Sequence, residues 1–489
     1  MPQEILVNVT PREVRVALIQ NAILHEIFIE RSIHQGLLGN IYKGKVNRLL
    51  PGIQAAFVDI GLERSAFLHV SDMNNVTRNG AVIEDMTRAD IRDFLTCGQE
   101  VLVQIYKDPL GTKGARLTTQ FTIPSRYLVF SPGVFQIAVS QRITDETERQ
   151  RLMEMITPGP NGGYIYRTAA EGAKQSEIDT DKEFLNALWL DVAARCNKAK
   201  ALDMIYQEIP IVLRVLRDQV GFGVARIRVD NQEAYQQMRA YAERYVPELV
   251  ERIEFYDDGK PIFDIYGIEE EIQKALERKV NLKSGGHLVF DQTEAMTTID
   301  VNTGSFLGSS DLEQTIFKTN LEAIEVIARQ VRLRNLGGII IIDFIDMTDP
   351  THKEHLLQSL IATLAKDNVK TQVSELSSLG LVQMTRKRTH ESLEHILCVS
   401  CPFCQSRGTI KSRQTVCYEI FRDIQRTAQY FAWDGFIVNA AADVIEVLTN
   451  EESELLASLE AKLGKPIKLK TENFYSRERY DILPLSKKG

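Results

Sequence analysis

The sequence lacks the features of a membrane protein, a fibre or a disulfide-stabilised miniprotein. Only 6 of its 489 residues are cysteine, and three of these lie within residues 398–404. This usage predicts a reduced, cytoplasmic chain with one local metal or redox site. No run of about 18 uncharged apolar residues occurs, which excludes a membrane-spanning helix. Residues 1–20 contain acidic side chains and lack the basic and apolar regions of a signal peptide.

Positive charge is also not in excess, because 58 Lys and Arg residues stand against 66 Asp and Glu residues, a net charge of −8. Any nucleic-acid binding must therefore depend on local patches. Apolar residues make up 44% of the chain and charged residues 25%, which is typical of a folded globular protein. The length predicts two to four domains, since single hydrophobic cores stop growing near ~250–300 residues.

The hydrophobic pattern predicts several α/β domains. Residues 4–31 alternate apolar and polar side chains, which predicts antiparallel strands with one buried face. Residues 36–70 continue as short strands separated by glycine, which is typical of a small β-barrel. Residues 287–347 predict a β-α-β unit with a helix over about 311–335, and a further strand-helix-strand unit ends the chain.

Two aspartates end the two strands of the β-α-β unit. Asp300 follows the strand at 296–299, and Asp343 follows the apolar run 339–342, which is typical of a strand covered on both faces. Because a helix joins these strands, we expect a right-handed crossover and parallel neighbouring strands. Both carboxylates would then lie at the carboxyl ends of the sheet, where open α/β folds bind ligands.

A carboxylate pair of this kind predicts a site for a hard divalent cation, which relieves the repulsion between the two charges. Asn302 would project from the same side as Asp300 and can orient a water or a phosphate oxygen. Gly304 would let the backbone approach a ligand closely, and Asp346 would support the loop. The alternative is that Asp300 and Asp343 are helix caps or turn residues, but their pairing on one β-α-β unit favours a functional site.

A cluster of cysteines predicts a second metal site. Cys401 and Cys404 flank Pro-Phe, the spacing at which two thiolates on one turn bind one side of a tetrahedral Zn²⁺ ion. The other two ligands would come from a second chain, or from Cys398, His395 or Cys417. A thioredoxin-like redox pair and unrelated buried cysteines are the alternatives, and the basic, glycine-flanked loop favours metal.

Basic residues gather in two places that suit a polyanion. In the predicted barrel, Phe57 and Phe67 lie among basic residues that include Lys113; OB-type barrels stack bases and contact phosphates in this way, although both rings can equally be core residues. Residues 383–414 hold six Lys or Arg residues against two Glu residues, a local charge of +6 − 2 = +4. That segment is either a solvated face or a surface for a polyanion.

Two strand ends between residues 125 and 210 carry arginine. Arg167 is followed by Thr168, and Arg142 ends another strand. The two guanidinium groups can bind a terminal phosphate by forked hydrogen bonds, although spacing alone favours a structural role.

The residues GNIYKGKVNRLLPGIQAAFVDIGLERSAFLHVSD resemble the S-one-type RNA-binding domain, an OB fold. With TTIDVNTG, IIIIDFIDMT and CPFC in this order, the whole chain resembles the ribonuclease E/G family of bacterial endoribonucleases. The resemblance implies an α/β multidomain architecture. Its parts would be an RNase-H-like subdomain from residues 1–35 and 211–280, an S-one-type OB domain from 36–124, a 5′-sensor from 125–210, a DNase-I-like catalytic domain from 281–397, a zinc-link from 398–413 and a small C-terminal α/β domain from 414–489.

The resemblance also assigns roles to individual residues. The family's catalytic positions fall on Asp300, Asn302 and Asp343, and the two aspartates would bind Mg²⁺. Its zinc ligands, which two protomers share, fall on Cys401 and Cys404. Its 5′-phosphate sensor falls on Arg167 and Thr168 with Val129 nearby, and we also assign Arg142 to this pocket; its RNA-binding barrel positions fall on Phe57, Phe67 and Lys113. Ser125 stands where the sensor of the family has glycine.

The activity implied is that of a Mg²⁺-dependent endoribonuclease that cuts single-stranded, A/U-rich RNA, is stimulated by a 5′-monophosphate and leaves 5′-phosphate and 3′-hydroxyl ends. Its partners would be ribosomal RNA precursors, mRNA and a second copy of the chain, in a homodimer or tetramer held by the zinc-link in the cytoplasm. The alternative is a non-catalytic, zinc-containing RNA-binding scaffold, which would need neither Asp300 nor Asp343. A thiol redox enzyme would keep its activity when Mg²⁺ is chelated.

Overall fold

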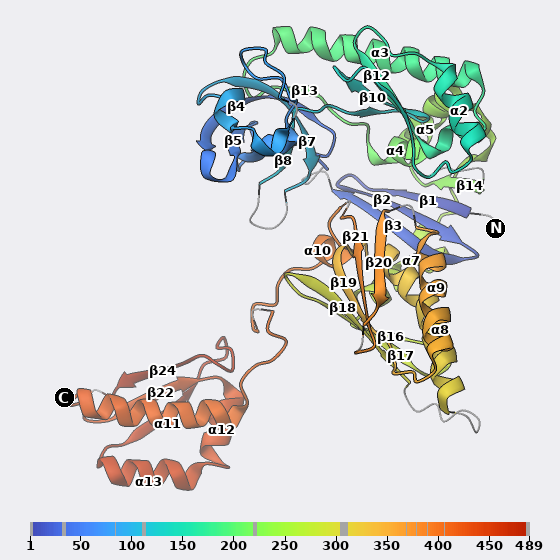
Figure 1. Cartoon of the computed structure of the whole chain (residues 1–489). Helices are drawn as coiled ribbons and strands as arrows, with labels where there is room; N and C mark the ends of the chain where they lie inside the picture. The colour runs from blue at the N-terminus through green and yellow to red at the C-terminus, as the bar shows by residue number, and fades with distance from the viewer. Residues whose placement is uncertain are drawn as a thin grey trace. The chain divides into compact units, whose positions relative to one another are not determined.

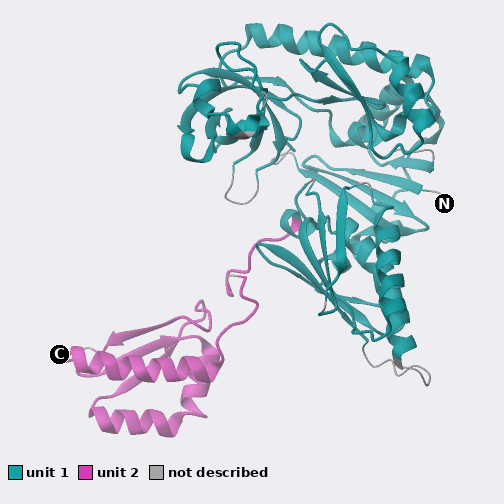
Figure 2. Ribbon diagram, in the orientation of Figure 1, with its two compact units in different colours: residues 1–396 teal, residues 397–489 magenta. Residues whose placement is uncertain are grey.

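The structure is a computed structural model that describes residues 3–31, 36–83, 85–109, 114–218, 223–303, 312–367, 369–377, 379–388, 390–404 and 406–485. Lys113 and Gly304 lie outside these ranges. The chain divides into two compact units, residues 1–396 and 397–489 (Figure 2). Within the described residues the strands form five sheets accompanied by helices (Figure 1), so the prediction of a mixed α/β multidomain chain is confirmed. None of the described helices combines the length and the apolar character that crossing a membrane requires.

The first sheet joins strands that are far apart in the sequence, in the order β15-β14-β1-β2-β3. β1 pairs antiparallel with β2, the next strand along the chain, and parallel with β14. Between β3 and β14 the chain forms two other domains. Helices α4 and α5 cover the sheet with a shared apolar core. The elements are β1 (Gln3–Val9), β2 (Glu13–Gln20), β3 (Ile23–Arg31), α4 (Ile211–Asp218), β14 (Val224–Val229), α5 (Gln232–Tyr245), η5 (Pro247–Arg252), β15 (Ile253–Phe255), α6 (Ile262–Ile265) and α7 (Ile268–Leu276).

The predicted small barrel is present. Its strands follow the order β4-β5-β6-β8-β7, and a further pairing of β4 with β7 closes the barrel. Gly114 lets the segments before β6 and β8 approach closely, because a Cβ atom on it would lie 2.3 Å from the carbonyl oxygen of Ser65. The elements are β4 (Ile41–Leu50), η1 (Pro51–Ile53), β5 (Ala55–Asp59), β6 (Ala66–His69), η2 (Val70–Asp72), η3 (Met86–Arg88), α1 (Ile91–Phe94), β7 (Glu100–Lys107) and β8 (Arg116–Thr118), with β13 (Met204–Tyr206) paired to β4.

A four-stranded sheet follows the barrel, in the order β11-β12-β10-β9. Buried side chains of the long helix α3, among them Ile178 and Leu185, pack into the same apolar core as Phe130 and Tyr164 of the sheet. The elements are β9 (Ile123–Pro124), β10 (Leu128–Pro132), β11 (Ile137–Val139), α2 (Glu146–Met155), β12 (Gly162–Tyr166), η4 (Thr168–Ala170) and α3 (Gln175–Lys198).

The sheet that carries the two aspartates has the order β16-β17-β18-β19-β21-β20. Helices α8 and α9 pack on one face, where Ile340 and Ile342 are completely buried. Ile339 is 46% exposed on the opposite face, so the prediction that residues 339–342 are covered on both faces is wrong. The elements are β16 (Lys279–Asn281), β17 (His287–Gln292), β18 (Met296–Asn302), α8 (Leu312–Leu333), β19 (Gly338–Asp343), α9 (Pro350–Leu364), β20 (Thr371–Leu376), β21 (Leu381–Arg386) and α10 (Leu393–Leu397).

The second unit contains a three-stranded sheet of order β23-β22-β24, in agreement with the strand-helix-strand pattern predicted at the end of the chain. Strands β22 and β23 are parallel, and β24 is antiparallel to β22. The elements are α11 (Arg413–Tyr430), β22 (Phe436–Ala440), α12 (Ala442–Thr449), α13 (Ser453–Leu463), β23 (Ile467–Thr471) and β24 (Tyr480–Pro484).

Candidate functional site

The carboxylate pair lies on two adjacent parallel strands. Residues of β18 and β19 pair in register so that Asp300 stands directly opposite Asp343, which confirms that the two aspartates are neighbours. Both are exposed, on the face of the sheet that α8 and α9 leave uncovered. Because adjacent strands are ~4.8 Å apart, one cation can reach both carboxylates.

The electrostatics of this pair favour a cation. Partial burial, together with the negative charges of Asp300 and Asp346, raises the pKa of Asp343 above its usual value. A group whose ionisation is opposed by neighbouring anions gains most when a cation arrives. The side-chain amide of Asn302 donates a hydrogen bond of 2.8 Å to Oδ2 of Asp300 and so fixes the orientation of that carboxylate.

The donor set at this site fits Mg²⁺. Carboxylate oxygens are the protein ligands that Mg²⁺ prefers, and the ion usually keeps several waters in its octahedral shell. In the part of the chain that the structure describes, no group of three or more His, Cys, Asp or Glu side chains is arranged to hold a metal ion. Asp300 and Asp343 would therefore be the protein ligands, with water or substrate oxygens completing the shell.

The Cys401–Cys404 turn has the hydrogen bonding of a thiolate ligand. Hydrogen bonds from the backbone N–H groups of Cys404 and Phe403, and then from the Cys404 side chain, lower the pKa of the Cys401 thiol. Cys401 is exposed and Cys404 partly exposed, so both sulfur atoms are open to a ligand. Surface-accessible thiols on one turn are suited to half of a tetrahedral Zn²⁺ site.

Cys417 lies in the core of the second unit rather than at this turn. Its side chain is completely buried among apolar residues of α11 and α12, and its Sγ lies 3.7 Å from the carbonyl oxygen of Val444. Burial raises the pKa of this thiol to about 11. A buried, protonated thiol is a poor zinc ligand, so the structure argues against Cys417 as a ligand that closes the site.

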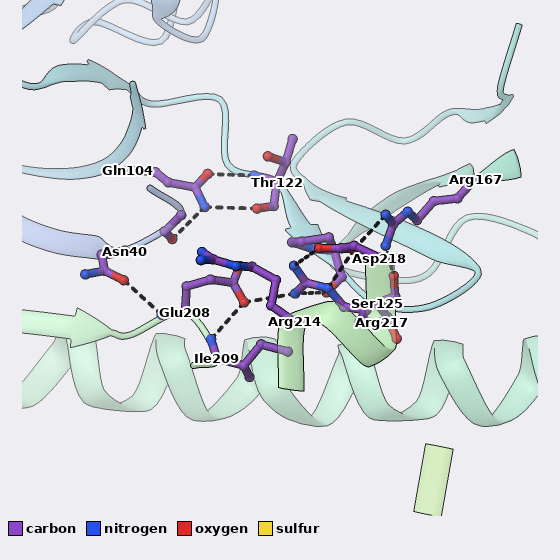
Figure 3. Close-up of polar contacts among 12 residues, drawn as sticks. Asn40, Gln104, Thr122, Ser125, Arg167, Glu208, Ile209, Arg214, Arg217 and Asp218 are labelled. Carbon is purple, nitrogen blue, oxygen red and sulfur yellow. Dashed lines mark hydrogen bonds and ion pairs between the residues drawn. The ribbon is translucent and has the colours of Figure 1, made fainter. Parts of the chain in front are cut away.

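Arg167 is tied to two partners where β12 ends. One guanidinium nitrogen forms a 2.7 Å ion pair with Asp218, and the other donates to the carbonyl oxygen of Ser125 at 2.5 Å (Figure 3). The side chain of Arg167 stays 25% exposed. The guanidinium group is therefore fixed in direction while part of it remains accessible to a ligand.

Two of the other predicted sensor residues, Thr168 and Arg142, contact Ser140. Its hydroxyl lies 3.2 Å from that of Thr168 and accepts a 3.3 Å hydrogen bond from the backbone N–H of Arg142. The guanidinium group of Arg142 donates to the carbonyl oxygen of Asp367, which follows α9. Arg142 thus connects the predicted sensor to the domain of the carboxylate pair. Val129 lies half-buried on β10, opposite Ile165.

Sequence reasoning missed a buried polar network around Arg217. The Arg217 side chain is 6% exposed, bonds both carboxylate oxygens of Asp218 and pairs with Glu208 at 2.9 Å (Figure 3). The backbone N–H of Glu208 donates to the side chain of Asn40. This network connects the partner of Arg167 to the first strand of the barrel. The only signal in the sequence is a polar pair at the end of an amphipathic helix, a pattern that is also typical of a solvated face.

The aromatic side chains predicted to contact RNA lie on the barrel surface. Phe57 and Phe67 stand opposite each other on β5 and β6, with ring centroids 6.1 Å apart in an edge-to-face arrangement. Phe57 is 36% exposed, and the guanidinium group of Arg116 lies 6.0 Å from the ring of Phe67. An aromatic pair with one exposed and one half-buried ring, beside a cation, suits base stacking better than a role in the barrel core.

Three of the six basic residues of 383–414 are paired with acids. Arg386 is 4% exposed and bonds Asp367. Arg407 pairs with Glu478, and Lys411 binds Glu419. The interpretation of this segment as a surface for a polyanion therefore stays a prediction, with three of its six positive charges compensated by acids.

Comparisons with known proteins agree with the motifs. Residues 122–389 match the model of the Ribonuclease E/G family, and residues 400–485 match the model described as RNase E/G, Thioredoxin-like domain. The chain is 51% identical to Ribonuclease G of Escherichia coli strain K12, over 99% of this chain and 100% of that protein. It is 49% identical to Ribonuclease G of Haemophilus influenzae, over 98% of this chain and 99% of that protein. Identity to Ribonuclease E of Buchnera aphidicola is 34%, over 96% of this chain and 49% of that protein.

Proposed function

This chain is an enzyme of the ribonuclease E/G family, and from that premise we propose that it cuts single-stranded, A/U-rich RNA with a Mg²⁺ ion held by Asp300 and Asp343. The observation that carries the proposal is the register of β18 and β19, which sets the two aspartates side by side on an open face of the sheet. A non-catalytic scaffold would have no use for such a costly pair of neighbouring charges, and the relatives compared above are all named as ribonucleases.

The residues around the carboxylate pair have different roles in phosphodiester hydrolysis. When bound, Mg²⁺ supplies a Lewis acid that polarises the scissile phosphate and lowers the pKa of an attacking water. Asp300 and Asp343 supply the negative charge that holds this ion. Asn302 is fixed by its bond to Asp300. Its amide oxygen can accept a hydrogen bond from the water, and the second hydrogen of its NH₂ group can be donated to a phosphate oxygen. A water nucleophile leaves the RNA 2′-hydroxyl uninvolved, so the products are a 5′-phosphate and a 3′-hydroxyl.

Substrate recognition is assigned to two other surfaces. The exposed ring of Phe57, with Phe67 and Arg116 beside it, stacks the unpaired bases that single-stranded RNA presents. Arg167 and Thr168 bind a 5′-terminal monophosphate, with Arg142 between this pocket and the catalytic sheet. The S-one-type OB, RNase-H-like and DNase-I-like subdomain assignments belong to the same proposal, as do the cytoplasmic location and the ribosomal RNA precursors and mRNA as substrates.

The cysteine turn is proposed to join two copies of the chain. Cys401 and Cys404 provide two thiolates, whereas a structural Zn²⁺ site is almost always four-coordinate. Among the residues that the structure describes, no larger ligand group completes the shell. A second copy supplies the other two thiolates by symmetry, which gives a homodimer and allows a tetramer built from such dimers.

Replacing Arg167 should reveal the 5′-end preference. In Arg167→Gln we expect cleavage of 5′-monophosphorylated RNA to fall about tenfold or more, because charge-assisted hydrogen bonds contribute ~1.5–3 kcal/mol. RNA with a 5′-hydroxyl should be cut almost as fast as by the wild-type enzyme. The measurement is kcat/KM on a matched pair of oligoribonucleotides that differ only at the 5′ end.

The matched control is Arg151→Gln, which removes an arginine of the same domain that pairs with Glu148 and carries no assigned role. That variant should treat both RNAs as the wild type does. Equal losses on both RNAs in Arg167→Gln would assign Arg167 to structure alone, since the residue also bonds Asp218 and Ser125.

Mg²⁺ should stabilise the folded chain in a pH-dependent way. The raised pKa of Asp343 means that its stabilising contribution is complete below the ordinary carboxyl pKa and is lost as pH rises through the raised value. Mg²⁺ binds the ionised pair and offsets that loss by ~2.7 kcal/mol when its concentration is 100 times its Kd. We therefore expect Mg²⁺ to raise the melting temperature clearly near pH 7 and hardly at all near pH 4. A Mg²⁺ effect of equal size in Asp343→Asn would contradict the assignment.

A further inference from the structure

Helix α8 carries a fully buried amide side chain that faces the loop after β19. Asn320 is 0% exposed, although buried neighbours on the same helix, such as Ala323 and Ile324, belong to the apolar core. Its Nδ2 donates to the carbonyl oxygen of Ile345 at 2.8 Å, and its Oδ1 accepts from the backbone N–H of Ile345 at 3.1 Å. One side chain thus satisfies both backbone polar groups of a single loop residue, which no apolar residue can do.

Ile345 lies between two aspartates, Asp343 at the end of β19 and Asp346 in the loop that follows. Asp343 is two residues before it, and Asp346 is the next residue along the chain. The negative charge of Asp346 acts on Asp343. Ile345, which Asn320 holds by two hydrogen bonds, therefore lies in the segment that carries both interacting carboxylates. Its conformation therefore sets how these two charges face Asp300.

The loop is also held on its other sides. Oδ1 of Asp346 would lie 3.0 Å from a Cβ atom on Gly380, whose backbone φ of +79° favours glycine. Further along the loop, the carboxylate of Glu313 accepts hydrogen bonds from Thr348 and from the backbone N–H of Asp349. Helix α8 therefore fastens the loop at two points, and Asn320 makes the bond closest to Asp343.

We propose that Asn320 is a positioning residue for the carboxylate pair, which sets the affinity for the divalent cation by fixing Ile345 and thereby the directions of Asp343 and Asp346. This inference rests on the proposed function. Asn320 touches neither the cation nor RNA. Its removal leaves two backbone groups of the loop without their partner, which is unfavourable for any group that stays buried, and the loop moves to relieve that cost. Changes in residues that orient metal ligands typically weaken metal binding 10–100-fold.

The test measures the Mg²⁺ concentration that gives half-maximal cleavage of a single-stranded oligoribonucleotide. We expect this concentration to rise about tenfold in Asn320→Ala and Asn320→Asp, with most of the activity restored at saturating Mg²⁺. Asn320→Asp is nearly isosteric and adds a negative charge that would by itself attract a cation. Weaker Mg²⁺ binding in that variant therefore reports lost geometry rather than lost charge. Binding of the same RNA without Mg²⁺, followed by fluorescence anisotropy, should be unchanged.

Two further variants keep the test decisive. Thr319→Val is the matched control, because Thr319 is 2% exposed beside Asn320 and its hydroxyl donates to the carbonyl oxygen of Thr315 in the same helix. The Mg²⁺ dependence of this variant should be that of the wild type. Asp346→Asn changes an exposed side chain and should fold, with a several-fold rise in the required Mg²⁺. If Asn320→Asp and Asp346→Asn both need the same Mg²⁺ concentration as the wild type, the inference is overturned. If the Asn320 variants fail to fold, an unchanged Mg²⁺ requirement in Asp346→Asn overturns it.

The outcome of this test is separable from that of the proposed function. If Asp300→Asn and Asp343→Asn are inactive while the Asn320 and Asp346 variants titrate like the wild type, only the positioning role fails. If the aspartate variants themselves remain active, the proposed metal site fails first.

Discussion

Asp300→Asn and Asp343→Asn should each reduce RNA cleavage by about 10³-fold or more, because a catalytic metal supplies several kcal/mol of transition-state stabilisation and each 1.36 kcal/mol is a factor of ten in rate. Either change removes one anionic ligand with almost no change in volume. RNA binding should persist, since the aromatic surface of Phe57 and Phe67 lies on the separate barrel. The measurements are single-turnover cleavage with saturating Mg²⁺ and anisotropy titrations without it.

The neighbouring strand offers a matched control. Asp291 lies on β17 and pairs with Arg278 at the surface, so Asp291→Asn removes a carboxylate from the same sheet without touching the pair. Exposed ion pairs contribute ~0–1 kcal/mol, and this variant should cleave as the wild type does. Near-wild-type cleavage by either Asp300→Asn or Asp343→Asn would show that the metal assignment is wrong.

The sequence predicted the placement of the carboxylates because topology leaves few alternatives. Two short strands joined by a helix of the length of α8 almost always form a right-handed parallel crossover, and the strand ends then share one edge. The same apolar run could not reveal that Ile339 is exposed. Four consecutive isoleucines fit a strand buried on both faces, and the difference depends on α8 and α9 packing on one side only, which is a property of the whole domain.

Residues that act through distant partners were not predictable. Arg217 and Asp218 end the short helix α4, and Asn320 lies in the middle of α8; polar side chains at such positions normally face solvent. Their roles depend on contacts with residues far away in the sequence, such as Glu208 for Arg217 and Ile345 for Asn320. Similarly, a count of charges in residues 383–414 could not show that Arg386 is buried against Asp367. Composition and period describe single elements, whereas these contacts form between elements.

Removal of the zinc turn should lower the mass of the assembly. Two thiolates per chain fill half of a tetrahedral Zn²⁺ shell, and a lone dithiol holds zinc weakly. With a second copy supplying the other half, we expect about half a mole of zinc per mole of chain. Cys401→Ser combined with Cys404→Ser should abolish zinc binding and reduce the mass measured by sedimentation equilibrium, with loss of the contact that a C2-symmetric pair shares. Strong chelators should have the same effect on the wild type.

Cys398→Ser separates this arrangement from a site closed within one chain. Cys398 is exposed near the turn, and an intramolecular site would need it as a third ligand. The shared site requires only Cys401 and Cys404, whose thiols are accessible and, for Cys401, have a lowered pKa. Cys398→Ser should therefore keep both the zinc content and the mass of the wild type. The shared site would be refuted if Cys398→Ser lost its zinc, or if the protein held about one zinc per chain and kept its mass when a chelator is added. Neither result would affect the nuclease assignment, because Asp300 and Asp343 belong to the other unit of the chain.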